Sequence, residues 1–269
     1  MNNAYGGGNG LWFGEGDGTS QLGYATELDI VCHEFTHSVT GEIVKWGSNN
    51  GETGSLNEAY SDIMGEYCDS SREWQHGTDQ YIANTNKNKA TRKTKYNRDL
   101  TKEDYIPYTK ARYKNIESHT GSSVISHVAY LMHYYGISDD VAMHIWYNSL
   151  DYLTSNASFE DCRDAVVNAA FKVVRNNTQD DVIRKIKTAF NRVRVCKSTE
   201  IMGDIDGDGG LTAFDLTMLK QIINGNRNYN GTKKAQADLN CDGKVDADDA
   251  RQLQRFLLAE ITEFTNKPL

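Results

Sequence analysis

A duplicated segment near the C-terminus is the strongest constraint on how this chain folds. The stretch GDIDGDGGLTAFDLTMLKQIING is repeated 34 residues later (Asp204 to Asp238) as ADLNCDGKVDADDARQLQRFLLA. Each copy carries acidic or amide side chains at loop positions 1, 3, 5 and 12, with glycine at position 6, and leads into a helical pattern. This spacing is typical of loops that wrap a calcium ion, here with Asp rather than Glu at position 12. The predicted ligands are Asp204, Asp206, Asp208 and Asp215 in the first loop and Asp238, Asn240, Asp242 and Asp249 in the second.

The duplication also marks a separate C-terminal module. Composition shifts over residues 197–202, so we expect one domain over residues 1–197 and another over residues 201–262. A chain of 269 residues is long enough for a substantial core. The net charge of −8 argues against a nucleic-acid partner, and the sequence contains no run of 18 apolar residues that would predict a membrane span.

The pentapeptide HEFTH, residues 33–37, is the second informative motif. Residues i and i+4 of a helix lie on one face, so His33 and His37 can present both imidazoles to one ion. Glu34 then lies beside the metal, where it can take a proton from water. The pentapeptide alone fits a zinc site and an ordinary amphipathic helix equally well. A zinc hydrolase also needs a third protein ligand.

A candidate third ligand follows in GSLNEAYSD, residues 54–62. Glu58 lies on the next predicted helix. Asp62 shares its face one turn later, where it can accept a hydrogen bond from a ligating histidine. The alternative is a solvated helix face. It is weakened by Leu56, Tyr60 and Ile63, which indicate a helix directed at the core.

HEFTH followed by GSLNEAYSD resembles the motifs of the thermolysin-like neutral zinc metallopeptidases. The resemblance implies one catalytic zinc bound by His33, His37 and Glu58. Glu34 would be the catalytic base, with Asn57 and Asp62 supporting the ligands.

Two further stretches extend the resemblance. SHTGSSVISHVAYLM is similar to the family helix that opens with an oxyanion-stabilising histidine, here His119; taken alone, His119 would be an ordinary surface histidine. Arg92 is similar in placement to the catalytic arginine that binds the substrate carbonyl. Asn3 and Ala4 resemble the edge strand that pairs with the substrate backbone.

The resemblance covers about Asn2 to Val195, which is the C-terminal part of a usual catalytic unit without its β-rich N-terminal half. We therefore expect a mainly α fold with a short β or loop segment at the N-terminus, followed by a small helical calcium module. Helices are predicted over residues 28–39, 55–68, 123–135, 139–153, 158–174 and 180–193, with Ser55 as an N-cap. Residues 87–114 are basic and irregular and are predicted to form a long surface loop with embedded turns.

Four acidic residues flank the two zinc helices, and by family resemblance they imply one structural calcium ion in the catalytic domain. Converging carboxylates repel one another unless a cation joins them. A solvated acidic helix end is the alternative. The residues are Asp29, Glu66, Asp69 and Glu73.

The duplicated calcium loops resemble the type I dockerin, a module that attaches enzymes to the cohesin modules of cellulosomal scaffolds. The resemblance implies two calcium ions and a cohesin partner. The alternative for Phe214 is that it packs between the repeats. The implied cohesin contacts are Ala213, Phe214 and Lys220 in the first repeat and Ala247, Asp248 and Arg255 in the second.

Together these patterns favour a secreted zinc endopeptidase that acts on peptide or protein substrates and is docked to an extracellular scaffold. A catalytically impaired fragment that mainly binds cohesin is the second hypothesis; a calcium buffer is a third and leaves the zinc motif unexplained. The N-terminus carries no signal peptide pattern. Most of the five cysteines are expected to be free thiols, with one disulfide left open.

Overall fold

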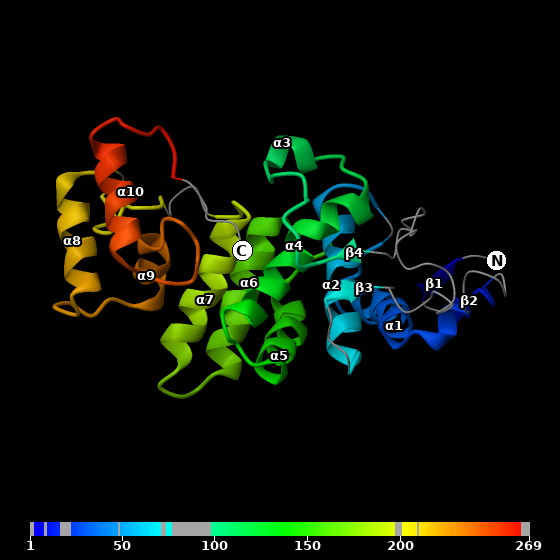
Figure 1. The fold of residues 1–269 in the computed structure, drawn as a ribbon. Helices are drawn as coiled ribbons and strands as arrows, with labels where there is room; N and C mark the ends of the chain where they lie inside the picture. The colour runs from blue at the N-terminus through cyan, green and yellow to red at the C-terminus, as the bar shows by residue number, and fades with distance from the viewer. Residues whose placement is uncertain are drawn as a thin grey trace, which may run out of the picture.

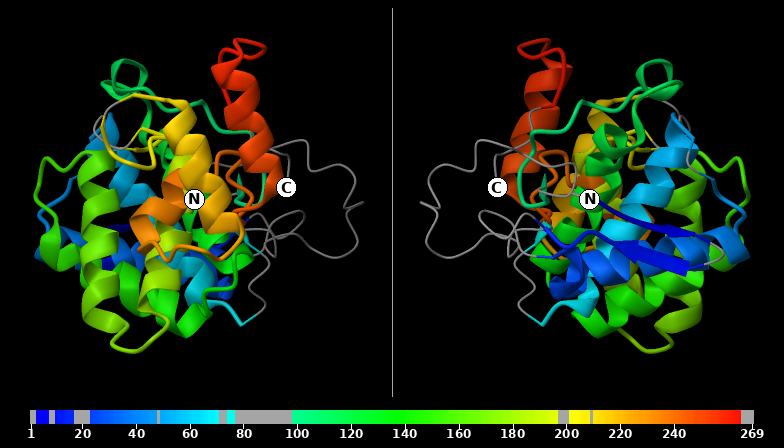
Figure 2. Two further views of the ribbon diagram at one scale, coloured as in Figure 1. Left: turned by 90° about the vertical axis from the view of Figure 1, so that its left-hand side faces the viewer. Right: turned by 90° about the vertical axis from the view of Figure 1, so that its right-hand side faces the viewer.

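The computed structural model describes residues 3–7, 10–16, 23–47, 49–70, 74–76, 98–196, 201–208 and 210–264. It confirms the mainly α fold with a short N-terminal β segment and a small helical module at the C-terminus (Figure 1). The N-terminal hairpin and the C-terminal module lie at opposite ends of the molecule; Figure 2 views the molecule from each of these ends.

The N-terminal segment is a two-stranded hairpin. Strands β1 (Ala4–Gly7) and β2 (Gly10–Phe13) pair antiparallel, with Ala4 opposite Phe13. A short 3-10 turn, η1 (Tyr24–Thr26), leads into α1 (Leu28–Ile43). Strand β1 lies directly on α1, because a Cβ atom added at Gly6 would stand 2.1 Å from the carbonyl oxygen of Glu34. The hairpin therefore flanks the helix that carries HEFTH.

The N-terminal module, which extends to residue 196 and carries HEFTH, is a helical bundle around one large core. Its longer helices are α2 (Glu52–Cys68), α4 (Ser118–Tyr134), α5 (Asp139–Ser149), α6 (Phe159–Val173) and α7 (Gln179–Arg192), with the 3-10 turn η3 (Leu150–Tyr152) after α5. Tyr60 of α2 is fully buried, contacts Trp146 of α5 edge to face and hydrogen-bonds Ser149 Oγ at 2.6 Å. The predicted helices are confirmed in type and order.

The start of α2 differs from the prediction. The helix begins at Glu52 after Gly51, whose φ of 86° is readily available only to glycine and whose N–H donates to Ile116 O at 2.7 Å. Ser55 is therefore not the N-cap; its hydroxyl lies inside the helix and donates to Gly51 O at 2.8 Å. A tertiary contact, rather than a local cap, sets this helix start.

The described part of the predicted surface loop, residues 98–114, is mostly exposed and rich in turns, but it is anchored to the core. Strand β4 (Arg98–Asp99) pairs with β3 (Gln75–His76), and α3 (Lys110–Tyr113) forms one turn. Leu100, Tyr108 and Tyr113 are buried in the main core. The polar residues around these three side chains gave no indication in the sequence that they are buried.

The C-terminal module has its own small core. Helices α8 (Ala213–Ile223), α9 (Gly231–Ala237) and α10 (Ala247–Leu257) enclose Ile205, Leu219 and Leu253. Helices α8 and α10 each begin with a capping box, formed by Thr212 with Asp215 and by Asp246 with Asp249. The two repeats thus share one local construction.

All five cysteines are free thiols. Among the described helices, none combines the length and apolar character that crossing a bilayer requires.

Replacing Gly121 of α4 with alanine is expected to destabilise the chain by about 1–3 kcal/mol, the usual cost of overpacking. A Cβ atom there would lie 2.1 Å from Ser55 Oγ of α2 and 2.7 Å from Ile116 Cγ2. Urea unfolding followed by circular dichroism measures the change. Gly41→Ala in α1 is the matched control, because its Cβ meets nothing nearer than Trp46 O at 3.9 Å. The control is expected to gain up to about 1 kcal/mol from helix propensity. Equal stability of the two variants would contradict the tight α2–α4 packing.

Candidate metal centre

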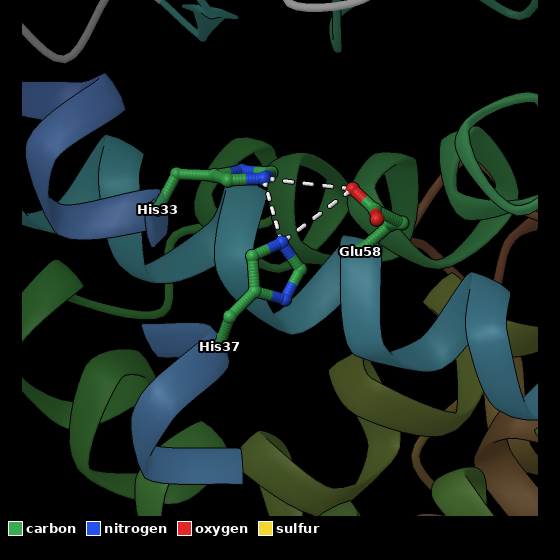
Figure 3. Close-up of side chains that lie close together, drawn as sticks. All are labelled: His33, His37 and Glu58. Carbon is green, nitrogen blue, oxygen red and sulfur yellow. Dashed lines mark hydrogen bonds and ion pairs between the residues drawn. The ribbon is translucent and has the colours of Figure 1, made fainter. Parts of the chain in front are cut away.

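Two adjacent helices bring His33, His37 and Glu58 together. The two histidines project from one face of α1, and their Nε2 atoms lie 3.1 Å apart. Glu58 projects from α2, and its Oε2 lies 3.5 Å from His33 Nε2 and 3.8 Å from His37 Nε2 (Figure 3). The three atoms form a small triangle whose members face one another, the arrangement that the sequence predicted for metal ligands.

The size of this triangle fits a tetrahedral zinc ion. Zinc–ligand bonds of about 2.0–2.2 Å imply ligand–ligand separations of roughly 3.3–3.6 Å. Within the described part of the chain, Glu58 Oε2 is buried, and its charged neighbours are the Nε2 atoms of His33, His37 and His119. A buried carboxylate needs a nearby positive charge, which a metal ion or a protonated imidazole can supply. The donor set, two imidazole nitrogens and one carboxylate oxygen, is that of catalytic zinc sites.

A shell of polar side chains fixes both imidazoles. Asp62 is fully buried, and its Oδ1 lies 3.0 Å from His33 Nδ1. Ser126 of α4 donates to the other oxygen of this carboxylate at 3.1 Å. Ser61 Oγ lies 3.2 Å from His37 Nδ1. With Nδ1 occupied in this way, each ring directs Nε2 toward Glu58.

Asn57 interacts with His37, whose pKa it acts to raise, and also links the two helices. Its Oδ1 accepts a hydrogen bond from Thr40 Oγ1 at 2.6 Å and so joins α1 to α2 one turn beyond His37. Ser61 was not singled out from the sequence. Its place three residues after Glu58 on the same helix face is the signal that could have found it.

The protonation equilibria reflect this crowding. Burial acts to lower the pKa of His33, but the carboxylates of Asp62 and Glu58 outweigh it and raise the pKa to about 9. Burial acts to raise the pKa of Glu58, but the neighbouring histidines bring it to about 2. Burial and the proximity of His33 lower the pKa of His37. Glu58 is therefore ionised and His37 neutral at pH 7, whereas His33 is protonated and has to release its proton when a metal binds.

His119 lies at the edge of the triangle. From the first turn of α4 it places Nε2 3.3 Å from Glu58 Oε2, and its Nδ1 lies 2.6 Å from Glu117 Oε1. Glu117 also caps α4 by accepting hydrogen bonds from the main-chain N–H groups of His119 and Thr120. Burial acts to raise the pKa of Glu117, and these contacts lower it to about 2. An ionised carboxylate thus holds the His119 ring in place.

The remaining predicted catalytic-domain residues are placed as follows. Glu34 directly follows His33 on α1 and is 2% exposed. Ala4 is buried beside Tyr24 and Ile30, and the main-chain oxygen of Asn3 accepts a hydrogen bond from Gly14 N at 2.9 Å. Arg92 and Glu73 lie outside the described residues.

The acids proposed for a catalytic-domain calcium lie where α1 begins and α2 ends. Asp29 and Glu66 are buried, and Asp69 is the C-cap of α2. Asp29 and Asp69 both help to raise the pKa of Cys32, although the largest contributions come from its hydrogen bond with Cys68 and from burial. These two acids therefore lie close to the same thiol.

In the C-terminal module, the predicted ligands converge in each loop. Oxygens of Asp204, Asp206 and Asp208 lie within 4.8 Å of one another. In the second loop, Asp238 accepts from the N–H groups of Asp242 and Gly243 at 3.1 and 3.0 Å. Burial, followed by the charges of Asp249 and Asp242, raises the pKa of Asp238 to about 8. Such clustered, desolvated carboxylates fit a divalent cation.

The residues expected to read a cohesin lie on the outer faces of α8 and α10. Ala213, Phe214 and Lys220 are exposed on α8, and Ala247 and Arg255 are exposed on α10, where Asp248 is half-buried. Phe214 is 57% exposed, so it does not pack between the repeats. A groove of about 420 Å³ runs between the two helices and is lined by Lys220, Ala247 and Arg255, among others.

Family models match nearly the whole chain. The model of the thermolysin metallopeptidase alpha-helical domain matches residues 48–195, and the model of the thermolysin metallopeptidase catalytic domain matches residues 1–41. A dockerin type I domain model matches residues 202–258.

Individual relatives agree with these matches. Thermolysin from Alicyclobacillus acidocaldarius subsp. acidocaldarius is 34% identical over 215 residues, covering 72% of this chain and 38% of the relative. Neutral protease NprE from Bacillus pumilus is 29% identical, covering 71% of this chain and 62% of the relative. This chain thus spans 38% of the length of the thermolysin relative.

Among solved structures, the precursor of protealysin, a metalloproteinase from Serratia proteamaculans, superposes with a TM-score of 0.58. The match covers 72% of this chain and 65% of that one at 21% identity, so it shows a shared fold.

Substituting Asp62 with asparagine is expected to weaken zinc binding about 10- to 100-fold, the usual effect of losing a carboxylate that orients a ligating histidine. Zinc affinity is measured by competition with a chromophoric chelator, and circular dichroism checks folding. The control is Asp139→Asn, because Asp139 pairs with His133 Nδ1 at 2.7 Å away from the candidate site. An equal loss of affinity in both variants would argue against a specific role for Asp62.

Proposed function

The chain belongs to the thermolysin metallopeptidase family and carries a type I dockerin, and from this premise we propose that it is a secreted zinc endopeptidase docked to a cohesin-bearing extracellular scaffold. The observation that carries the proposal is the triangle of His33, His37 and Glu58, with separations of 3.1, 3.5 and 3.8 Å. These residues would hold one zinc ion.

Bound zinc would supply a water molecule with a pKa lowered to about 7 and polarise the scissile carbonyl. Glu34, beside His33 on α1, accepts the proton of the attacking water and delivers it to the leaving amine. A buried carboxylate suits this role because little solvent competes for its proton.

His119 is the proposed donor to the oxyanion. The Glu117 carboxylate lies 2.6 Å from Nδ1 and so orients the ring. Nε2 then faces the ligand triangle, where negative charge develops during attack. A donor of this kind contributes about 3 kcal/mol to transition-state stabilisation. Arg92 is proposed to assist by binding the substrate carbonyl, and Asn3 and Ala4 to align the substrate backbone.

Calcium is proposed at three places. The C-terminal loops would hold one ion each, and Asp29, Glu66, Asp69 and Glu73 would hold a third in the catalytic domain. The exposed outer faces of α8 and α10, with Phe214 at their edge, would bind the cohesin. An extracellular location follows from that partner.

A second candidate function rests on the C-terminal module. The dockerin match and the exposed residues of α8 and α10 do not depend on the zinc triangle, so an impaired peptidase whose main activity is cohesin binding fits the same residues. The two candidates differ in one measurement, chelator-sensitive hydrolysis of a casein-type substrate. Hydrolysis supports the first candidate, and cohesin binding without hydrolysis supports the second.

Glu34→Gln is expected to retain zinc but to lower peptide hydrolysis about 10²- to 10⁴-fold, the usual contribution of a general base. Metal analysis and a chelator-controlled peptidase assay measure the two effects. Glu42→Gln on the same helix is the control, since Glu42 is an exposed partner of Lys45. Unchanged hydrolysis in Glu34→Gln would remove Glu34 from the mechanism.

Phe214→Ala is expected to weaken cohesin binding at least tenfold, because exposed aromatic side chains commonly dominate such interfaces. Calorimetry with a panel of type I cohesin modules measures affinity. Phe171→Ala is the matched control, because Phe171 is 51% exposed on α6 of the other module. Unchanged affinity of Phe214→Ala for every cohesin that binds the unmodified chain would assign recognition to the second repeat.

A further inference from the structure

The two calcium loops share a sequence pattern but have different surroundings. The main chain of the second loop is held by three side chains of the peptidase module. Tyr135 Oη donates to Cys241 O at 2.7 Å, Arg184 Nη1 donates to Gly243 O at 2.7 Å, and Arg192 Nη1 donates to Asn240 O at 3.2 Å. The three carbonyls belong to loop positions 3, 4 and 6; position 3 is the predicted ligand Asn240, and positions 4 and 6 flank the predicted ligand Asp242.

The two arginine donors are themselves fixed. The side chain of Arg192 is fully buried and pairs with Glu103, whose pKa is lowered to about 2, first by His127, against the opposing effect of burial, and then by Arg192. Arg184 also pairs with Asp181 at 2.8 Å, one turn earlier on α7. Their positions are therefore set by the peptidase module and not by the loop.

The main chains of the two modules also pack closely against each other. A Cβ atom at Gly243 would lie 2.7 Å from the ring of Tyr135, and one at Gly231 of α9 would lie 2.4 Å from Asp180 O. Helices α7 and α9 lie side by side in Figure 1. Asn191 Nδ2 adds a hydrogen bond to Ala235 O at 3.4 Å.

The second loop needs this support at one position in particular. Cys241 at position 4 has a φ of 50°, a left-handed conformation that is unfavourable for a residue with a Cβ atom. The equivalent residue of the first loop is Gly207, with a φ of 81°, where that cost does not arise. The carbonyl of Cys241 is the one that Tyr135 holds. The described contacts of the first loop include internal ones, such as Gly207 N to Asp204 Oδ1 at 2.7 Å.

We propose that Tyr135, Arg184 and Arg192 are positioning residues for the second calcium loop, so that calcium binding at this loop is coupled to its docking on the peptidase helices. Tyr135, Arg184 and Arg192 hold the main-chain carbonyls of the loop, while Asp238, Asn240 and Asp242 supply the side-chain ligands. The loop is therefore ordered before calcium binds, and this preorganisation raises the affinity of the loop for calcium. By reciprocity, calcium in this loop strengthens the contact between the modules. This inference rests on the calcium assignment of the proposed function.

The test compares the loops within the full chain. Asp208→Ala leaves only the second loop intact, and Asp242→Ala, the same loop position, leaves only the first. Into each background the pair Tyr135→Phe and Arg184→Gln is introduced. The control pair, Tyr134→Phe and Arg175→Gln, alters exposed neighbours; Tyr134 is 52% exposed. Calcium is titrated by calorimetry, and any other calcium site is common to both backgrounds and cancels.

With the second loop intact, the positioning variants are expected to lower calcium affinity about tenfold, within the usual range of coupling between sites. With only the first loop intact, affinity stays within about twofold, and the control pair changes neither value. The calcium-induced rise in the thermal midpoint of the peptidase module is expected to shrink in step. Tyr135→Phe alone, which removes one hydroxyl and preserves the ring, is expected to show the same selectivity at a smaller amplitude.

Two results would overturn the coupling. One is an equal loss of affinity at both loops. The other is no loss at the second loop while both loops bind calcium. If calcium binds neither loop in the unmodified chain, the calcium assignment fails together with the coupling. That outcome leaves the zinc proposal untouched and is therefore distinguishable from its failure.

Discussion

The crossing of α1 and α2 is the contact on which the candidate centre depends. Two side-chain bridges span it, from Thr40 to Asn57 at 2.6 Å and from His33 to Asp62 at 3.0 Å. Both lie in the interior, where a polar pair persists only when each partner is satisfied. A rotation of either helix would break both bridges together, so the separation of the ligand atoms is a property of the crossing as a whole.

The same crossing explains why the interior contains so much ionisable chemistry. Glu34, Glu58, Asp62 and Glu66 are all buried within a few turns of one another. A core with these groups is less stable than an apolar one of equal volume unless cations or histidines balance the charge. Two metal sites back to back, one at the histidines and one behind them, would balance it. In the C-terminal module, the clustered carboxylates of the two loops would likewise be balanced by bound cations.

Much of this arrangement could be predicted from the sequence because it rests on local periodicity. The i and i+4 spacing placed His33 and His37 on one face, and the apolar pattern around Glu58 directed that helix to the core. The start of α2 could not be predicted, since Gly51 is fixed by the hydrogen bond that its N–H donates to the carbonyl of Ile116, far along the chain.

Long-range contacts account for the other misses as well. Tyr135 and Arg184 showed no pattern that would distinguish them from ordinary surface residues. Their partners are main-chain carbonyls of the other module. Every residue has such a carbonyl, so the sequence does not indicate which ones will accept these hydrogen bonds. Tyr108 and Tyr113 were concealed by the polar residues around them. Their burial against Phe159 becomes visible only once α6 has packed.

The aspartates at the last position of each loop join three parts of the chain at a single carboxylate. In the second repeat, Asp249 Oδ1 accepts from the N–H of Leu239 at the loop entrance, and Oδ2 accepts from that of Asp246 at the helix entrance. The aspartate at position 12 thus closes each loop by hydrogen bonds within the chain. The same hydrogen bonds fix the direction of the helix that follows the loop. The orientation of the exposed faces of α8 and α10 therefore depends on these aspartates. A substitution of either aspartate would reorient the helix that follows as well as open the loop.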